Sequence, residues 1–168
     1  MKLESIAIGR IVNAHGTRGE VRVMPIHQPP QFLTRFKTFY MDGTPVQPEA
    51  NHVHKSFVLL KLPGVDDMNA ALNLKGTELF IRREDAGLKS GECFDEELLG
   101  MQVFSTDTGA FLGRITAVED YPASKVYTVR GEREYLIPAV PDVFIQSVDL
   151  DGDRMEVHIL EGMATDEN

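Results

Sequence analysis

The chain has 168 residues, of which 42% are hydrophobic and 26% are charged, so it has enough apolar material to bury a core. No run of about 18 apolar residues occurs, which excludes a membrane-spanning helix, and the single cysteine, Cys93, excludes an internal disulfide framework and a cysteine-based zinc site. The net charge of −9 argues against a protein that coats nucleic acid with its whole surface. The start of the sequence lacks an apolar leader, so we expect a protein of the cytoplasm.

The first part of the chain predicts short strands and one helix. Residues 6–12 have strand character, and apolar and polar residues alternate over 20–23, which predicts a hairpin around the glycine-containing loop between them. Residues 65–74 predict the only helix, because helix-forming side chains follow Asp66 at a capping position and precede Gly76. Further strands are predicted over 36–40, 52–62 and 79–81.

The second part of the chain predicts strands separated by short turns. Charged and turn-forming residues gather over 83–91, where we place the boundary between two domains. Short strands at such close spacing are typical of a barrel or a sandwich. These strands are predicted over 101–104, 112–118, 126–129, 135–137, 143–150 and 155–159. The predicted organisation is a domain over 1–83, a linker over 84–92, a domain over 93–163 and a disordered tail over 164–168.

The charge of the chain is divided between its two halves. Residues 1–90 hold 12 Lys and Arg against 9 Asp and Glu, a net charge of +3. Residues 91–168 hold 5 Lys and Arg against 17 Asp and Glu, a net charge of −12. The first half could therefore lie against phosphates, whereas the second half would repel phosphates and attract a basic protein. The alternative is an uneven spread of charges that serve only solubility.

The loop between the first two predicted strands is one candidate site. It contains a Gly-x-x-Gly sequence, with Gly16 and Gly19 at its ends, Arg18 inside it and His15 just before it. Such a loop can bring backbone N–H groups and a cation close to a phosphate, so we expect these four residues to contact RNA or a particle that contains RNA. RNA-binding KH modules use the same spacing between two helices, which does not fit the flanking strands here. The alternative is a plain hairpin turn.

The start of the second domain is the other candidate site. One aromatic residue, Phe94, stands among four carboxylates, Glu92, Asp95, Glu96 and Glu97. An exposed ring surrounded by negative charge suits the anchor of a basic protein surface. The alternative is that Phe94 belongs to the core. Burying three adjacent carboxylates would be costly, which favours the exposed anchor.

Catalytic and metal sites are not predicted. Asp149, Asp151 and Asp153 alternate as calcium ligands do, but the glycine and glutamate of an EF-hand are missing, so a hairpin turn explains the segment better. His52 and His54 share one face of a strand without an evident third zinc ligand. The sequence contains no nucleophile elbow, P-loop or dinucleotide fingerprint. We therefore expect no cofactor, no metal and no enzymatic activity, with an unrecognised hydrolase as an alternative.

The order of these segments resembles the RimM family of bacterial ribosome maturation factors over roughly residues 5–163. The most specific match is the opening segment 8–23, with the sequence IGRIVNAHGTRGEVRV. Shorter matches follow in the order of the family: His54-Lys55, Leu62-Pro63-Gly64-Val65-Asp66-Asp67, Ala70-Ala71, Lys75-Gly76-Thr77-Glu78-Leu79, Leu98-Leu99-Gly100, Leu136-Ile137-Pro138-Ala139-Val140 and Glu161-Gly162-Met163.

The resemblance implies a fold and a role. The implied fold is all-β, with an N-terminal six-stranded barrel like those of translation factors, carrying one short helix, and a C-terminal PRC barrel. The implied role is that of a monomer that binds a basic head protein of the small ribosomal subunit, the nineteenth in its series. Through this contact, and through an indirect or weak contact with the pre-small-subunit particle and its rRNA, the protein would assist subunit assembly and rRNA processing. A PRC-barrel adaptor in another complex is the alternative.

The sequence departs from the family pattern at two places. Where the family carries consecutive aromatic residues at the start of the second domain, this chain has Cys93 and Asp95 on either side of Phe94. The segment around Lys125 lacks the Asn-Asp that the family usually has before a strand. Neither departure removes a predicted strand, so the expected fold is unchanged.

Overall fold

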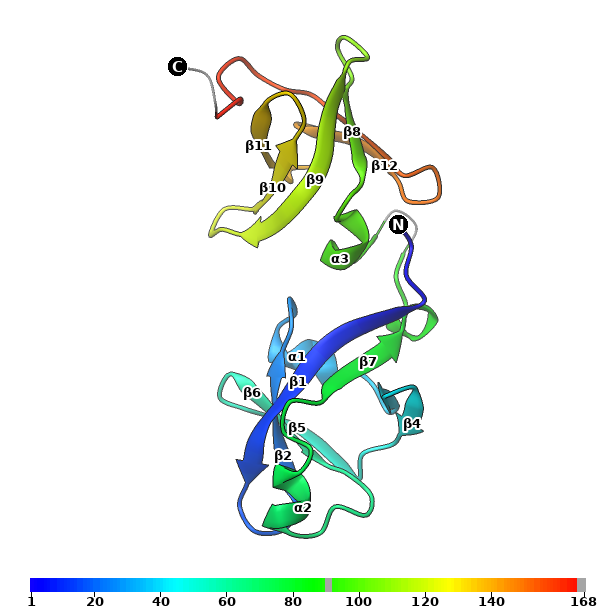
Figure 1. Ribbon diagram of the computed structural model, residues 1–168, viewed down its shortest axis with the longest axis vertical. Helices are drawn as coiled ribbons and strands as arrows, with labels where there is room; N and C mark the ends of the chain where they lie inside the picture. Colours follow the sequence, from blue (N-terminus) through cyan, green and yellow to red (C-terminus); the bar gives the residue numbers. More distant parts are fainter. Residues whose placement is uncertain (90–91, 166–168) are drawn as a thin grey trace. The chain divides into compact units, whose positions relative to one another are not determined.

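The computed structural model describes residues 1–89 and 92–165 (Figure 1). The chain divides into two compact units, one formed by Glu4–Gly87 and the other by Leu88 onward together with Met1–Leu3. The first three residues therefore belong to the second unit. No helix in the described ranges is long and apolar enough to cross a membrane.

The N-terminal unit is built on one seven-stranded sheet with the order β4-β3-β7-β1-β2-β6-β5. All neighbouring strands in it are antiparallel. In Figure 1 the long strand β1 crosses the middle of this unit. The strands are β1 (Ser5–His15), β2 (Glu20–Pro25), β3 (Phe39–Met41), β4 (Thr44–Val46), β5 (Ala50–His54), β6 (Phe57–Lys61) and β7 (Glu78–Arg82).

Alternating side chains explain why β1 and β2 lie at the centre of this sheet. Ile6, Ile8 and Ile11 on β1 and Val21 and Val23 on β2 are at most 2% exposed. Full burial of each such side chain stabilises the fold by about 1.5–3 kcal/mol. The two strands therefore hold the core of the N-terminal unit together and fix the loop that joins them.

Short helices complete the N-terminal unit: α1 (Pro30–Leu33), α2 (Met68–Leu72) and the 3-10 helix η1 (Arg83–Ala86). Helix α2 begins after Asp67, whose carboxylate accepts a hydrogen bond from the N–H of Ala70 at 2.7 Å. The sequence predicted the preceding residue, Asp66, as the cap. Asp66 instead forms an ion pair with Lys61 at 3.0 Å.

The C-terminal unit contains a six-stranded sheet with the order β11-β10-β9-β8-β13-β12. Its neighbouring strands are antiparallel except for the parallel pair β8 and β13. The strands are β8 (Gln102–Ser105), β9 (Phe111–Asp120), β10 (Lys125–Arg130), β11 (Glu134–Pro138), β12 (Ile145–Asp149) and β13 (Arg154–Val157), preceded by helix α3 (Asp95–Leu98). The core consists of Leu98, Met101, Val103, Leu112, Ile115, Val129, Ile137, Met155 and Val157.

The all-β prediction is confirmed, with differences in individual elements. The N-terminal sheet has one strand more than the six expected, because the chain turns back after β3 into the short edge strand β4. The segment predicted as one strand over 52–62 is the hairpin β5–β6, with Lys55 at a φ of +58° in its turn. Helices α1 and α3 escaped prediction because each has only four residues, too few to show a helical period.

Residues 164 and 165 pair with β11. Ala164 is 8% exposed and pairs with Tyr135, and the N–H of Thr165 donates to the carbonyl oxygen of Glu134 at 2.8 Å. The prediction of disorder is therefore wrong for residues 164 and 165. Residues 166–168 of the predicted tail, and residues 90 and 91 of the predicted linker, lie outside the described residues.

Candidate functional site

The loop between β1 and β2 lies at the surface, and its second glycine, Gly19, packs against the backbone of Val65. Gly16 and Arg18 are exposed, His15 is half-buried and Gly19 is buried. Gly19 has a φ of +91°, and a Cβ atom on it would lie 2.1 Å from the carbonyl oxygen of Val65. A side chain at this position would collide with backbone, so only glycine fits. The four residues predicted from the sequence thus share one loop with a fixed base.

The backbone behind Gly19 is itself fixed by Lys61. The ammonium group of Lys61 donates to the carbonyl oxygen of Leu62 at 3.3 Å, to that of Val65, and to the carboxylate of Asp66 at 3.0 Å. The side chain of Lys61 is only 19% exposed, so its hydrogen bonds to the two carbonyl oxygens are partly shielded from water, whereas the side chain of Asp66 is 81% exposed. The β1–β2 loop therefore rests on an ordered segment.

Side chains of β1 and β2 near this loop contact rings of the hairpin β5–β6. The ring centroid of His15 lies 5.2 Å from that of His54 at the end of β5. The guanidinium carbon of Arg22 lies 5.3 Å from the ring centroid of Phe57. Arg18 forms no ion pair with any residue of the described ranges, so its guanidinium can meet a phosphate oxygen. The sequence did not connect His54 with the loop, because contacts between distant strands leave no pattern in residue spacing.

The acidic segment at the start of the second unit folds inward. Phe94 is 3% exposed and precedes α3 as its N-cap residue. Its backbone N–H donates to the carboxylate of Glu97 at 2.9 Å, and the other oxygen of that carboxylate accepts the N–H of Leu3 at 2.9 Å. Glu97 is 0% exposed. The prediction that Phe94 is an exposed anchor is therefore wrong, and the ring is a core residue.

The neighbouring carboxylate is buried through an ion pair. Asp95 is 9% exposed, and the ammonium of Lys125 donates to its two carboxylate oxygens at 2.7 and 2.8 Å. The two departures from the family pattern, at Asp95 and around Lys125, therefore contact each other. Burial, together with the electrostatic effects of the neighbouring Cys93 and Asp95, raises the pKa of Tyr127 to about 12. Cys93 and Tyr127 are partly buried and pack against the core of the second unit.

Two of the five predicted partner-binding residues remain at the surface. Glu92 is exposed and accepts the N–H of Lys89 at 3.1 Å, and Glu96 is half-buried. The two carboxylates are buried in spite of the cost of desolvation, because each accepts hydrogen bonds from donors of its own. Two backbone N–H groups serve Glu97 and an ammonium serves Asp95. The sequence does not show those donors, and so it could not show the burial.

The structure exposes an aromatic residue of the second unit, Phe111, that the sequence did not single out. Phe111, at the start of β9, is 54% exposed and lies opposite Phe104 on β8. The guanidinium carbon of Arg154 lies 3.7 Å from the ring centroid of Phe104. A phenylalanine beside Leu112 at the start of a strand is typical of a core position, so only the register of the sheet could have revealed the exposed ring.

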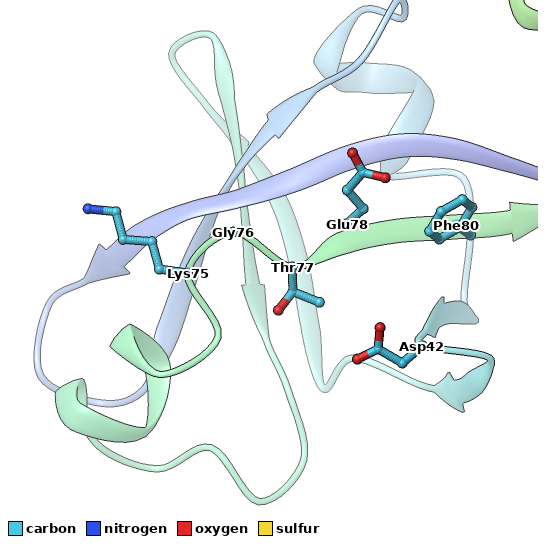
Figure 2. A pocket seen from close by; sticks show the side chains of 6 residues that line it. All are labelled: Asp42, Lys75, Gly76, Thr77, Glu78 and Phe80. Atoms are coloured by element: carbon cyan, nitrogen blue, oxygen red, sulfur yellow. The ribbon is translucent and has the colours of Figure 1, made fainter.

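A groove of about 580 Å³ opens in the N-terminal unit between the β3–β4 turn and the start of β7 (Figure 2). Next to it, β3 and β7 pair at a single position, with Tyr40 opposite Phe80. The carboxylate of Glu78 is held by Arg10 of β1 at 2.7 Å, and Phe80 is the only apolar side chain in the lining. The groove thus lacks the apolar enclosure typical of small-molecule sites. It is lined by Asp42, Lys75, Gly76, Thr77, Glu78 and Phe80.

The fold defines the chain as a β protein of two compact units, each built on one sheet. Within residues 1–89 and 92–165, no group of three or more His, Cys, Asp and Glu side chains could hold a metal ion. The family model of the RimM N-terminal domain matches residues 6–86, and that of the RimM PRC barrel domain matches residues 95–163. The chain belongs to the RimM family, which confirms the predicted family and both predicted domain types.

Relatives match the chain from end to end. It is 33% identical to a ribosome maturation factor RimM of Clostridioides difficile over 96% of its own length and 97% of that protein. It is 38% identical to a ribosome maturation factor RimM of Geobacter metallireducens, with 94% of each chain covered. A crystal structure of a RimM protein from Pseudomonas aeruginosa is 27% identical, covers 93% of this chain and 98% of that chain, and has a TM-score of 0.47.

Proposed function

We propose that this chain is a ribosome maturation factor that acts by binding and catalyses no reaction of its own. Its C-terminal unit would hold a basic head protein of the small ribosomal subunit, the nineteenth in its series. The β1–β2 loop of the N-terminal unit would contact the pre-ribosomal particle. Together the two contacts would assist small-subunit assembly and rRNA processing in the cytoplasm. The names of the relatives, ribosome maturation factors, are the starting point of this proposal.

The charge of the C-terminal unit is the observation that carries the proposal. Residues 4–87 hold 10 Lys and Arg against 9 Asp and Glu, and the rest of the chain holds 7 against 17. The net charges of the two units are therefore +1 and −10. A unit with this excess of carboxylates attracts a basic protein and repels the phosphates of RNA. The protein contact accordingly belongs to the C-terminal unit.

The segment around Phe94 has an altered role in this proposal. Phe94, Asp95 and Glu97 are buried, so they would act by fixing the position of α3 and not by touching a partner. Glu92 and Glu96 remain at least partly accessible and would add to the negative charge that a basic protein meets. Most of the contact area must therefore come from another surface of the unit.

The contact of the N-terminal unit would be the weaker of the two. Its net charge of +1 provides little general attraction for RNA, so binding would depend on local groups. Arg18 is exposed in a loop whose base is fixed by Gly19, which supports a single phosphate contact. Such a contact would position the pre-ribosomal particle without reading its sequence.

Capture from a bacterial lysate tests the proposal. The full chain, immobilised through a tag, should retain the basic head protein and particles that contain precursor small-subunit rRNA. Purified head protein should then bind the full chain directly. The Arg18→Ala variant should retain the head protein but lose part of the particles. Recovery of no small-subunit component, together with no binding of the purified head protein, would contradict the proposed function.

A further inference from the structure

The outward face of β8 and β9 carries a pair of aromatic rings. Phe104 lies directly opposite Phe111, with ring centroids 5.4 Å apart and ring planes at 57°. The adjacent residues Val103 and Leu112 point into the core and are 0% and 8% exposed. Phe111 keeps 54% of its surface exposed. The pair therefore offers an aromatic surface to solvent on a sheet whose other face is fully packed.

A bulge in β9 places Phe111 on this face. Phe111 and Gly113 pair with consecutive residues of β8, so Leu112 between them is left out of the ladder and turns into the core. Gly113 has a φ of +145°, and a Cβ atom on it would lie 2.2 Å from the carbonyl oxygen of Arg130. Glycine is required there, and the exposed position of Phe111 is thus built into the backbone.

The guanidinium group of Arg154 lies over one of the two rings, that of Phe104. The guanidinium carbon of Arg154 lies 3.7 Å from the ring centroid of Phe104, and its charge is balanced by Glu156 at 3.1 Å. Among the residues that the structure describes, no cation lies over the ring of Phe111. The face therefore stacks an arginine of the chain itself on one ring and leaves an equivalent ring open.

Two carboxylates lie on the elements that carry or adjoin the aromatic pair. Glu156 pairs with Phe104 in the parallel ladder, and Asp107 in the β8–β9 turn has a half-exposed side chain, 2.7 Å from His158. The unit as a whole carries a net charge of −10. An open ring in this setting favours a cationic side chain and disfavours a phosphate. Arginine suits the ring best, because its planar guanidinium stacks on aromatic faces.

We propose that this face of β8 and β9 is a docking surface for a basic protein, with the ring of Phe111 receiving an arginine side chain of the partner. This inference rests on the proposed function, in which the C-terminal unit holds a basic protein of the small subunit. It places that contact on exposed strands and not on the buried segment around Phe94. RNA is the less suited occupant, because the neighbouring Arg154 is already engaged by Glu156.

Four substitutions in the full chain test the inference against purified basic head protein, with affinity measured by calorimetry. Phe111→Ala should weaken binding by about tenfold or more, as expected of an interface anchor. Phe111→Leu should weaken it nearly as much, because it retains apolar surface but has no π face, whereas Phe111→Tyr should retain affinity. Tyr121→Ala is the matched control, because Tyr121 is 53% exposed and follows the other end of β9. It should change the affinity by less than about twofold.

The outcomes separate the docking surface from the proposed function. If the natural chain binds the head protein and Phe111→Ala binds equally well, the docking surface is overturned and the proposed function stands. If the natural chain does not bind at all, the proposed function fails. If Phe111→Ala leaves the head protein bound but loses a single-stranded RNA oligonucleotide that the natural chain holds, the surface serves RNA and the inference is wrong. Thermal melts of all four variants should match the natural chain, because both residues are exposed.

Discussion

The β1–β2 loop and the segment around α3 are the two regions that the sequence predicted as sites, and they fold in opposite ways. The loop keeps Arg18 exposed on a base fixed by Gly19. The segment around α3 buries Phe94 and two of its carboxylates. Gly16 and Gly19 predicted the exposed loop correctly, because glycines in a turn depend on the local backbone conformation. Carboxylates did not predict exposure, because their burial depends on donors from distant parts of the chain.

The difference concerns what holds each region in place. The backbone of Gly19 packs against the backbone of Val65, so the position of the loop does not depend on the side chain of Arg18. In the α3 segment the side chains themselves make the holding contacts, with Glu97 bound to two backbone N–H groups and Asp95 bound to Lys125. A region whose charged groups are used for packing has few left for a partner. Substitutions should therefore affect binding in the loop and stability in the α3 segment.

The largest effect is expected from Phe94→Ala. Removing a ring that is 3% exposed should lower the free energy of unfolding by about 3–5 kcal/mol. Phe111→Ala is the control of the same chemistry at an exposed position and should change it by less than about 1 kcal/mol. Urea unfolding of both variants measures the two values. Equal, small losses would contradict the burial of Phe94.

A glycine pair in the loop should give the next largest effect. Gly19→Ala forces a Cβ atom to within 2.1 Å of a carbonyl oxygen, so the loop must shift, at about 2 kcal/mol or more. Gly16 also has a positive φ, but a Cβ atom on it would meet nothing within 4 Å. Gly16→Ala should therefore lower the free energy of unfolding by only about 1 kcal/mol. Similar stabilities of the two variants would show that the backbone behind Gly19 does not hold the loop.

The ion pair between Asp95 and Lys125 should couple the two residues more modestly. A double-mutant cycle with Asp95→Asn and Lys125→Met should give a coupling of about 1 kcal/mol, because Lys125 remains partly exposed.

The tyrosine nearby supplies a second measurement. Asp95→Asn removes a negative charge beside Tyr127, so the pKa of that tyrosine should fall below about 12 in an NMR titration. An unchanged pKa would contradict this placement of Asp95.

The smallest effect on stability is expected from Arg18→Ala. Its side chain is exposed and makes no ion pair within the described ranges, so the free energy of unfolding should change by less than about 0.5 kcal/mol. Association with pre-ribosomal particles, measured by co-sedimentation, should nevertheless decrease. A destabilised variant with normal association would support a hairpin turn without a binding role.

The sequence predicted most of the fold because strand patterns are local. Alternation around Ile8 and Val21 located the central hairpin, and the change of period near Ala70 located α2. Very short elements were missed, including α3, because four residues show no period. The hairpin β5–β6 was predicted as one strand, since Lys55 gives no sign that it would adopt a positive φ.

The candidate site was predicted less well because it depends on contacts between distant residues. The loop from His15 to Gly19 could be found, since all its members are neighbours in the chain. The burial of Glu97 required the N–H of Leu3, and the exposure of Phe111 required a bulge opposite β8. Neither the burial of Glu97 nor the exposure of Phe111 leaves a pattern in the local sequence. Side-chain contacts across a sheet therefore mark the limit of what residue spacing can show.

The salt dependence of binding tests most directly whether the acidic C-terminal unit binds a basic protein through charge. The dissociation constant of the full chain for the purified head protein can be measured from about 50 mM to about 500 mM NaCl, over which the Debye length falls severalfold. Screening of the −10 unit should weaken binding by about tenfold or more across this range. An affinity that stays constant from low to high salt would contradict the claim.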